Sequence, residues 1–221
     1  MVFCLSSDID RIEELRFRNK HKKEWKKIKE LTHFTYLEIE CLMIIFYKMQ
    51  KREVKVPAYN LISRSNFRDV LYTGLGIIDT NLMERVMIVL NKGTSPYITW
   101  TTFAEIMSIY PRGTLDEKIE YTFQCYDIFH EGFLRRSTMY HLLKKSMSHQ
   151  WEEDNVATVK DLTMTLMMRM DLDCDGVIHY QNFRQTIKKN PGLLQCLGFC
   201  LPKREAVHTF LATWNPNWPK L

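Results

Sequence analysis

The stretch that decides the fold reads Asp171-Leu172-Asp173-Cys174-Asp175-Gly176-Val177-Ile178-His179-Tyr180-Gln181-Asn182. Its three acidic residues stand at the first, third and fifth positions, the sixth residue is glycine and the eighth is β-branched. When a short loop wraps a hard cation, its odd positions point oxygen atoms inward, and a glycine at the sixth position supplies the positive φ of a sharp turn. The stretch therefore predicts a loop that holds a divalent cation.

The spacing is that of an EF-hand calcium loop, in which the twelfth side chain closes the ligand shell. The expected Ca²⁺ ligands are Asp171, Asp173, Asp175, the carbonyl of Val177 and the side chain of Asn182. Asn182 offers one amide oxygen where two carboxylate oxygens normally bind. Because calcium affinity follows ligand charge and rigidity, we expect one weak Ca²⁺ site at most. The alternative is a metal-free loop whose aspartates are hydrated and cap the next helix.

The same register can be laid on residues 91–102 and 127–138, and the apolar positions of the three loops then coincide. The eighth residue of the loop is Ile98, Leu134 or Ile178. The residue directly after the loop is Phe103, Met139 or Phe183. The residue four positions before the first loop residue is Met87, Phe123 or Met167. This repeat predicts three helix-loop-helix units. A capping box at Thr114 to Glu117 and the pair Asn190-Pro191 mark helix ends within it.

The metal ligands do not repeat with the apolar positions. Loop 91–102 has no carboxylate, and its candidate positions hold Asn91, Gly93, Ser95, Pro96 and Thr102. In loop 127–138 two arginines, Arg135 and Arg136, offset Asp127 and Glu131; Phe129 stands where an oxygen is needed, and Thr138 replaces the closing glutamate. We expect both loops to be empty.

Apolar residues recur at three and four along most of the chain, with only 8 Gly and 7 Pro to interrupt them, so helices dominate. We predict an all-α, two-lobed EF-hand fold of paired helix-loop-helix units with short loop strands, preceded by a basic N-terminal helix. The expected parts are residues 1–30 as the basic helix, 31–110 as an N-terminal lobe with a vestigial unit near 35–75, 111–190 as a C-terminal lobe, and 191–221 as a segment packing on the lobe.

The net charge of +5 comes largely from the basic helix, since residues 11–30 hold nine Lys and Arg against four Glu. The body of the chain is close to neutral, which does not suit a diffuse nucleic-acid-binding surface. The sparse apolar positions of this helix are Ile12, Leu15, Trp25 and Ile28. Three interpretations remain open: a solvated face, a surface for acidic protein segments, and a helix that binds lipid or nucleic acid.

The sequence lacks the signatures of secreted proteins, membrane proteins and common enzyme families. The 6 Cys are scattered without a CxxC pair, and the sequence has neither a signal-peptide pattern nor an apolar run of membrane-spanning length. We expect a soluble, cytoplasmic protein with reduced thiols and no stable membrane anchor. No P-loop, G-x-S-x-G or HExxH motif is present, so we predict no enzyme and no small-molecule substrate.

Several segments resemble the calaxin family of EF-hand calcium-binding proteins of outer dynein arms. They are Arg64-Ser65-Asn66-Phe67-Arg68, the linker from Gly113 to Lys118, and the ending formed by Leu193-Leu194 and Gly198 to Pro202. The resemblance implies a fold like that of the neuronal calcium sensors. It also implies protein partners, namely outer-arm dynein or its docking components and tubulin, and a place on the axoneme of a cilium or flagellum. The near-neutral body of the chain, rather than the resemblance, leads us to expect no nucleic-acid partner.

The resemblance implies an adaptor or regulator that tunes ciliary or flagellar motility with Ca²⁺. This chain departs from the family's pattern, because it lacks the ligand set in two loops and the acidic closing residue in the third. It therefore resembles a divergent paralogue, and we expect Ca²⁺ to alter it little. The alternative is a Ca²⁺-operated regulator of an enzyme or channel, of the neuronal-calcium-sensor type. Two apolar groups have open interpretations. The methionines Met164, Met167, Met168 and Met170 are either a partner groove or core, and the segment Leu193 to Leu201 either competes with a target or closes the core.

Overall fold

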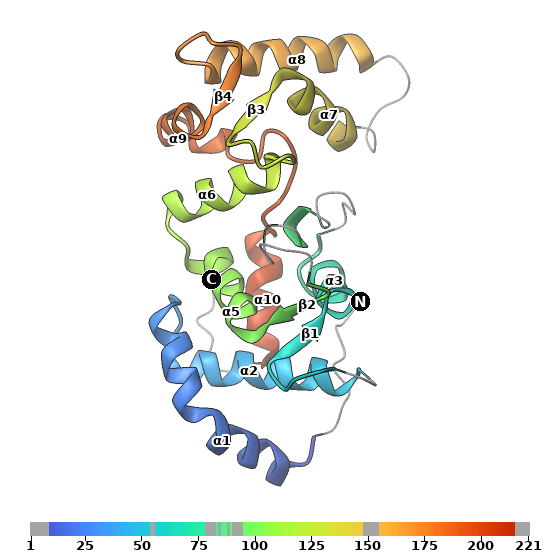
Figure 1. Cartoon of the computed structure of the whole chain (residues 1–221), viewed down its shortest axis with the longest axis vertical. Coiled ribbons are helices and arrows are strands. Elements are labelled where there is room, and N and C mark those ends of the chain that lie inside the picture. Colours follow the sequence, from blue (N-terminus) through green and yellow to red (C-terminus); the bar gives the residue numbers. More distant parts are fainter. Residues whose placement is uncertain are drawn as a thin grey trace. The chain divides into compact units, whose positions relative to one another are not determined.

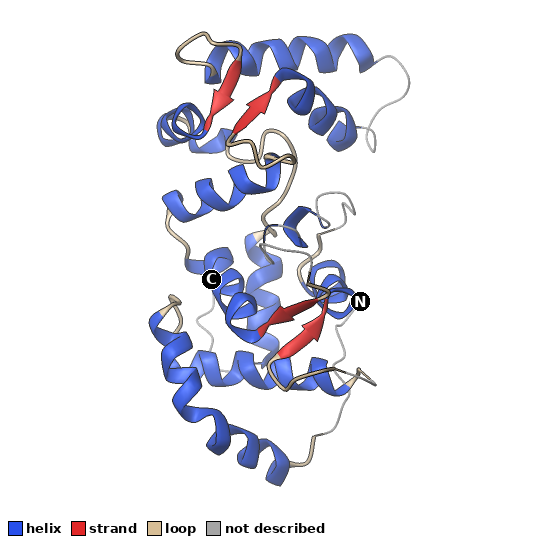
Figure 2. Ribbon diagram, viewed as in Figure 1, coloured by secondary structure: helices blue, strands red, loops and turns tan. Residues whose placement is uncertain are grey.

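The computed structural model describes residues 9–53, 56–77, 83, 85–87, 89, 95–147 and 155–214. Helices dominate these residues, and their short strands form two antiparallel pairs (Figure 2). The chain divides into two compact units, which are described separately. Unit 1 comprises residues 1–78, 90–113 and 202–221, and unit 2 comprises residues 79–89 and 114–201.

Unit 1 is built around one strand pair (Figure 1). Its elements are α1 (Arg11–Glu30), α2 (Tyr36–Lys51), β1 (Leu61–Ser63), α3 (Arg64–Asp69), the π-helical turn η1 (Val70–Gly74), β2 (Tyr97–Thr99), α5 (Trp100–Arg112) and α10 (Arg204–Trp214). Strand β1 pairs with β2 so that Ile62 lies opposite Ile98, and both side chains are buried. The vestigial unit expected near residues 35–75 is therefore the pairing partner of the loop 91–102.

Unit 2 repeats the arrangement around a second strand pair. Its elements are α6 (Leu115–Tyr126), β3 (Phe133–Arg135), α7 (Arg136–Met147), α8 (Asn155–Met170), β4 (Val177–His179), α9 (Tyr180–Lys189) and the 3₁₀ turn η2 (Pro191–Leu193). Leu134 and Ile178, the eighth residues of their loops, lie opposite each other in the β3–β4 pair and are buried. Paired helix-loop-helix units joined by short strands confirm the all-α EF-hand fold.

The repeated apolar positions form the core of both units. Phe103, Met139 and Phe183, each directly after a loop, are fully buried, and Met87, Phe123 and Met167 are buried as well. In unit 1 the ring of Phe103 lies 5.5 Å from that of Phe46 and 5.6 Å from that of Phe67. Aligning the other two loops with the acidic loop therefore identifies the core residues of their helix-loop-helix units.

Helix ends follow the capping signals. The Thr114 hydroxyl accepts a hydrogen bond from the Glu117 N–H, and the Glu117 carboxylate accepts one from the Thr114 N–H, so the capping box of α6 is confirmed. An equivalent box at Thr35 and Glu38 opens α2. Helix α9 ends at Lys189, directly before Asn190-Pro191, as predicted.

The apolar face of α1 differs from the one we predicted. Ile12 and Leu15 are exposed, while Phe17 and His21 join Trp25 and Ile28 in the buried stripe. These four residues follow each other at spacings of four, four and three, which places them on one side of a helix. The Phe17 ring stacks on Tyr47 of α2 at 3.9 Å, so this face holds α1 against unit 1.

Two segments lie in a different unit from the one we expected. The described part of residues 79–89, with buried Met83, Val86 and Met87, belongs to unit 2 rather than to the N-terminal lobe. The C-terminal segment is shared: residues up to 201 belong to unit 2, whereas α10 packs against α2, α5 and η1 in unit 1. The Phe210 ring packs so closely on Gly74 that a β-carbon there would lie 2.9 Å from it.

A long-range ion pair fixes the start of α2 to the end of α5. Arg112 donates to both carboxylate oxygens of Glu38, at 2.6 and 2.7 Å, and also to the carbonyl of His33. Burial disfavours the charged form of Glu38, but hydrogen bonds from Arg112 and the Thr35 N–H lower its pKa below the usual value. The carboxylate therefore stabilises unit 1 at neutral pH, and that stabilisation is lost as the pH falls through the lowered pKa.

Replacing Arg112 with Ala is expected to lower the free energy of unfolding of unit 1 by about 3 kcal/mol, because Glu38 is left buried without its cation. Denaturant unfolding at pH 7 measures the loss. The control is Arg135→Ala, which removes an exposed ion pair with Glu131 and should cost under about 1 kcal/mol. Equal losses in the two variants would contradict the role given to the Arg112–Glu38 pair.

Candidate calcium site

The predicted loop connects α8 to β4 in unit 2. The Asp171 N–H donates to the carbonyl of Met167 at 2.8 Å, which continues the last turn of α8 into the loop. Asp171, Asp173 and Asp175 each contribute a carboxylate oxygen to a cluster in which these atoms lie within 4.8 Å of one another. The structure therefore brings together the three aspartates that the alternate spacing predicts.

The backbone of the loop is turned around Asp171. One carboxylate oxygen of Asp171 accepts a hydrogen bond from the Asp175 N–H at 3.2 Å, and the other accepts one from the Gly176 N–H at 3.0 Å. Gly176 has a φ of 86°, the left-handed conformation that favours glycine. The sharp turn expected at the sixth position is thus present.

The twelfth residue closes the loop through an amide. Asn182 lies in the first turn of α9 and is buried, and its Nδ2 donates to Oδ1 of Asp173 at 2.7 Å. A glutamate in this place would carry a negative charge toward Asp173 and would need a cation between them. Asn182 instead donates to Asp173 directly, and this hydrogen bond joins the first half of the loop to α9.

Val177 and His179 lie on β4 beside the aspartates. Val177 pairs with Arg135 of β3, and its N–H donates to Asp175 Oδ1 at 3.0 Å. Nε2 of His179 lies 2.9 Å from Asp175 Oδ2. Sequence reasoning missed this histidine, although its spacing of four from Asp175 was available as a signal. A metal that binds this Asp175 oxygen would have to displace the contact with His179.

The donor set of this loop fits Ca²⁺. It offers carboxylate, amide and carbonyl oxygens, which are the ligands that a hard cation prefers, and its one thiol, Cys174, stands outside the carboxylate cluster. The ligand charge comes from three aspartates alone. Ca²⁺ is therefore the metal that suits this site, with a less charged shell than one closed by glutamate.

The loop at residues 127–138 uses its acidic residues internally. The Asp127 carboxylate accepts from the Glu131 N–H at 3.0 Å and the Gly132 N–H at 2.8 Å. Glu131 accepts from Arg135 at 2.9 and 3.0 Å, and these hydrogen bonds lower its pKa. Phe129, at the third position, is exposed. The two acidic side chains of this loop are therefore engaged within the protein, and that the loop is empty stays a prediction.

In the loop at residues 91–102, Asn91 and Gly93 lie outside the described residues. The Ser95 hydroxyl accepts from the Tyr97 N–H, the Pro96 carbonyl accepts from the Arg64 N–H, and the Thr102 hydroxyl is hydrogen-bonded to the Thr99 hydroxyl at 3.0 Å. These three oxygen-bearing positions are engaged in the turn and in the start of α5. That this loop is empty also stays a prediction.

Some methionines of α8 are core residues, and others are exposed where a partner could bind. Met167 and Met170 are buried in the core, whereas Met164 is 45% exposed and Met168 is 72% exposed. In the segment after α9, Leu197 is buried and Phe199 is exposed. Tyr126 of α6 donates to the carbonyl of Gly198 at 2.7 Å, which ties this segment to unit 2.

Paired helix-loop-helix units and an acidic twelve-residue loop define the class of protein: this is an EF-hand protein. The chain is 32% identical to calaxin of Danio rerio over 183 residues, which cover 82% of this chain and 87% of the relative. It is 33% identical to calaxin of Xenopus laevis over 181 residues, with 81% and 87% covered. The chain belongs to the calaxin family.

A more distant similarity points to the same class. Calcineurin B of Candida glabrata is 26% identical over 160 residues, which cover 72% of this chain and 85% of that protein. No protein-family model matches the chain. The resemblance to calaxin read from the sequence is confirmed, and fold, loop and relatives together support a calcium-binding regulatory protein of the EF-hand type.

Proposed function

We propose that this chain is a non-catalytic adaptor of the axoneme, which binds outer-arm dynein or its docking components and helps to regulate ciliary or flagellar motility. Membership of the calaxin family carries this proposal, because the sequence resembles that family over most of the chain. We expect the adaptor to keep its shape with and without Ca²⁺, because the hydrogen bond from Asn182 to Asp173 joins the loop to α9 and needs no cation.

One weak Ca²⁺ site belongs to the proposal. Its ligands are the side chains of Asp171, Asp173, Asp175 and Asn182 and the carbonyl of Val177. The support is the clustering of the three carboxylates and the placement of Asn182 beside Asp173. Binding requires the Asn182 amide to turn its oxygen toward the cation, and the hydrogen bond to Asp173 opposes that turn.

The outer face of α1 is the surface that we assign to an acidic partner such as tubulin. Its exposed cations are Arg11, Arg16, Lys20, Lys22, Lys23, Lys26, Lys27 and Lys29. Of its four glutamates, Glu30 is exposed and Glu13, Glu14 and Glu24 are half-buried. The buried stripe of α1 faces its own unit, which leaves Ile12 and Leu15 as its exposed large apolar residues. This face offers many charges and only these two large apolar side chains, which suits acidic protein segments better than a lipid bilayer. No helix among the described residues is long and apolar enough to cross a membrane.

Co-sedimentation of the full chain with purified axonemes tests both parts of the proposal. Wild-type protein is expected to pellet with axonemes, and less so as salt is raised, since exposed charges are screened. The triple variant Lys22→Glu, Lys26→Glu, Lys27→Glu should bind about tenfold more weakly, because like charges then face the acidic partner.

The matched control reverses three exposed lysines elsewhere, Lys144, Lys189 and Lys203, with the same change in net charge. Wild-type protein that stays in the supernatant contradicts the axonemal role. Equal weakening by the two triple variants contradicts only the assignment of the α1 face, because general charge then explains the binding.

A second candidate is a Ca²⁺-operated regulator of an enzyme or channel. The exposed Met164 and Met168 on α8 favour it, because adaptable methionine surfaces bind partner helices, as does the similarity to calcineurin B. This candidate requires Ca²⁺ to expose further apolar surface. Binding of an apolar fluorescent dye with and without Ca²⁺ distinguishes it from the constitutive adaptor, for which the signal should stay unchanged.

A further inference from the structure

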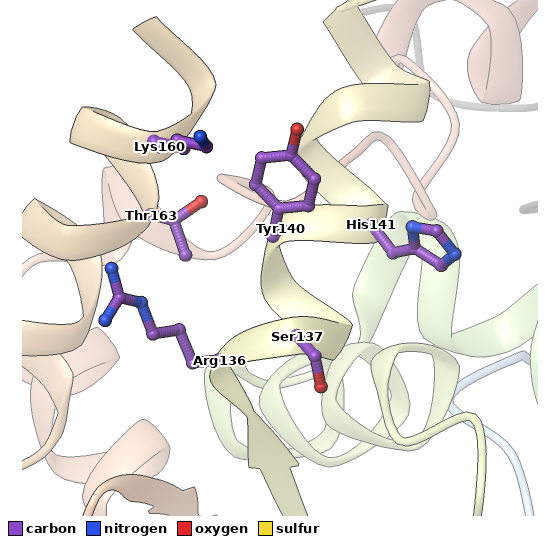
Figure 3. Close-up of a pocket in the computed structure, with 6 residues that line it drawn as sticks. All are labelled: Arg136, Ser137, Tyr140, His141, Lys160 and Thr163. Carbon is purple, nitrogen blue, oxygen red and sulfur yellow. The ribbon is translucent and has the colours of Figure 1, made fainter. Parts of the chain in front are cut away.

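A cavity of about 520 Å³ lies between α7 and α8 of unit 2, apart from the acidic loop. It is lined by Arg136, Ser137, Tyr140, His141, Lys160 and Thr163. In Figure 3 the side chains of Arg136 and Tyr140 on α7 and of Lys160 and Thr163 on α8 surround one space, while Ser137 and His141 extend from α7 away from α8. Its volume is in the range of pockets that hold small organic ligands.

The charge of the lining has one sign. Arg136 and Lys160 come from different helices, and none of the lining residues that the structure describes is a carboxylate. Within the described part of the chain neither cation has a salt bridge, whereas the neighbouring Arg135 is bound to Glu131, and Arg184 and Lys188 share Asp116. The two uncompensated cations favour an anion between α7 and α8.

The neutral groups add an apolar wall and a donor. Tyr140 is half-buried, so its ring forms part of the wall, and its hydroxyl can donate to a ligand. The buried Thr163 hydroxyl already donates to the Val159 carbonyl at 2.6 Å and has no further proton to offer. Arg136 is the first residue of α7, and the positive end of the helix dipole adds to its charge. The ligand should therefore combine a compact anion with an apolar body.

We propose that this cavity binds a phosphate monoester on an aromatic or aliphatic body. The phosphate lies between the guanidinium of Arg136 and the ammonium of Lys160, because a planar fork and a point charge both pair well with phosphate oxygens. The apolar body packs against the Tyr140 ring. This site is independent of Ca²⁺ and of the α1 surface assigned to the acidic partner.

Calorimetric titration of the full chain, with a chelator present to remove Ca²⁺, tests the proposal. The probes are phenyl phosphate, inorganic phosphate and phenol. Phenyl phosphate should bind saturably and more tightly than inorganic phosphate, and phenol should not bind. Inorganic phosphate that binds as tightly as phenyl phosphate would overturn the apolar part of the site. Equal binding of phenol and phenyl phosphate would overturn the anionic part.

Pairs of variants test whether phenyl phosphate binds in this cavity. Arg136→Gln and Lys160→Gln should each weaken phenyl phosphate binding about tenfold, because each removes one charge-assisted contact. Arg135→Gln and Lys189→Gln make the same change in charge at residues that do not line the cavity, and binding should be unchanged. All four side chains are exposed, so the fold should be kept. No saturable binding by wild type, or equal weakening by both pairs, would overturn the proposal.

Discussion

Replacing Asn182 with Glu is expected to raise the Ca²⁺ affinity of the loop at residues 171–182 by roughly 10- to 100-fold. The substitution adds a fourth negative charge and a second closing oxygen to a shell whose other members are already clustered. It also removes the amide that donates to Asp173, so the metal-free loop loses its internal closure. Ca²⁺ should then produce a conformational change that the wild-type protein lacks. Calorimetry gives the affinity, and near-ultraviolet circular dichroism reports the change.

The control for this prediction is Asn182→Gln, which lengthens the side chain as glutamate does but adds no charge. Its affinity for Ca²⁺ should stay close to that of the wild type or fall. If Asn182→Gln raised the affinity as much as Asn182→Glu, reach rather than charge would limit the site. An unchanged affinity in Asn182→Glu would show that residue 182 does not face the metal.

Replacing Trp25 with Ala is expected to cost about 3 to 5 kcal/mol of the free energy of unfolding of unit 1, because a fully buried large side chain is removed. Trp25 lies on the inner face of α1 with its ring 5.6 Å from that of Phe17, and His21 of the same cluster packs against Tyr59 and Trp100. The loss should appear as release of α1 before the rest of unit 1 unfolds. Hydrogen exchange of the α1 amides measures that release.

Trp25→Phe is the matched control. The Trp25 indole N–H is buried without a hydrogen-bond partner among the described residues, so phenylalanine removes an unsatisfied donor while it keeps most of the apolar contact. Its cost should be under about half that of the alanine variant. An alanine variant with unchanged protection of α1 would contradict the packing described for this helix.

The parts of the fold that sequence predicts are those encoded locally. The spacing of Asp171, Asp173, Asp175 and Gly176 predicts the loop. Aligning the other loops with it predicts that Ile98, Leu134 and Ile178 are the buried residues of the short strands. Capping at Thr114 depends on residues within one turn and is equally readable. These features need no knowledge of distant contacts.

The features that sequence did not predict depend on contacts between remote segments. Phe17 and His21 are buried because α2 and the Trp100 region lie beside them, which the pattern of α1 alone does not reveal. Arg112 and Glu38 are 74 residues apart, and α10 packs in unit 1 although it follows unit 2 in the chain. Met164 and Met168 lie outside the core, and the sequence alone does not show which of the methionines in this helix are buried.

A calorimetric Ca²⁺ titration of the full chain, beside Asp171→Ala, tests most directly the claim that this EF-hand protein keeps one weak calcium site. We predict a single saturable event, weaker than in Asn182→Glu and lost in Asp171→Ala, because the carboxylate of Asp171 organises the loop backbone and joins the metal cluster. Binding that persists in Asp171→Ala, or a second event in wild type, would contradict the account, because the metal would then lie in a loop that we consider empty.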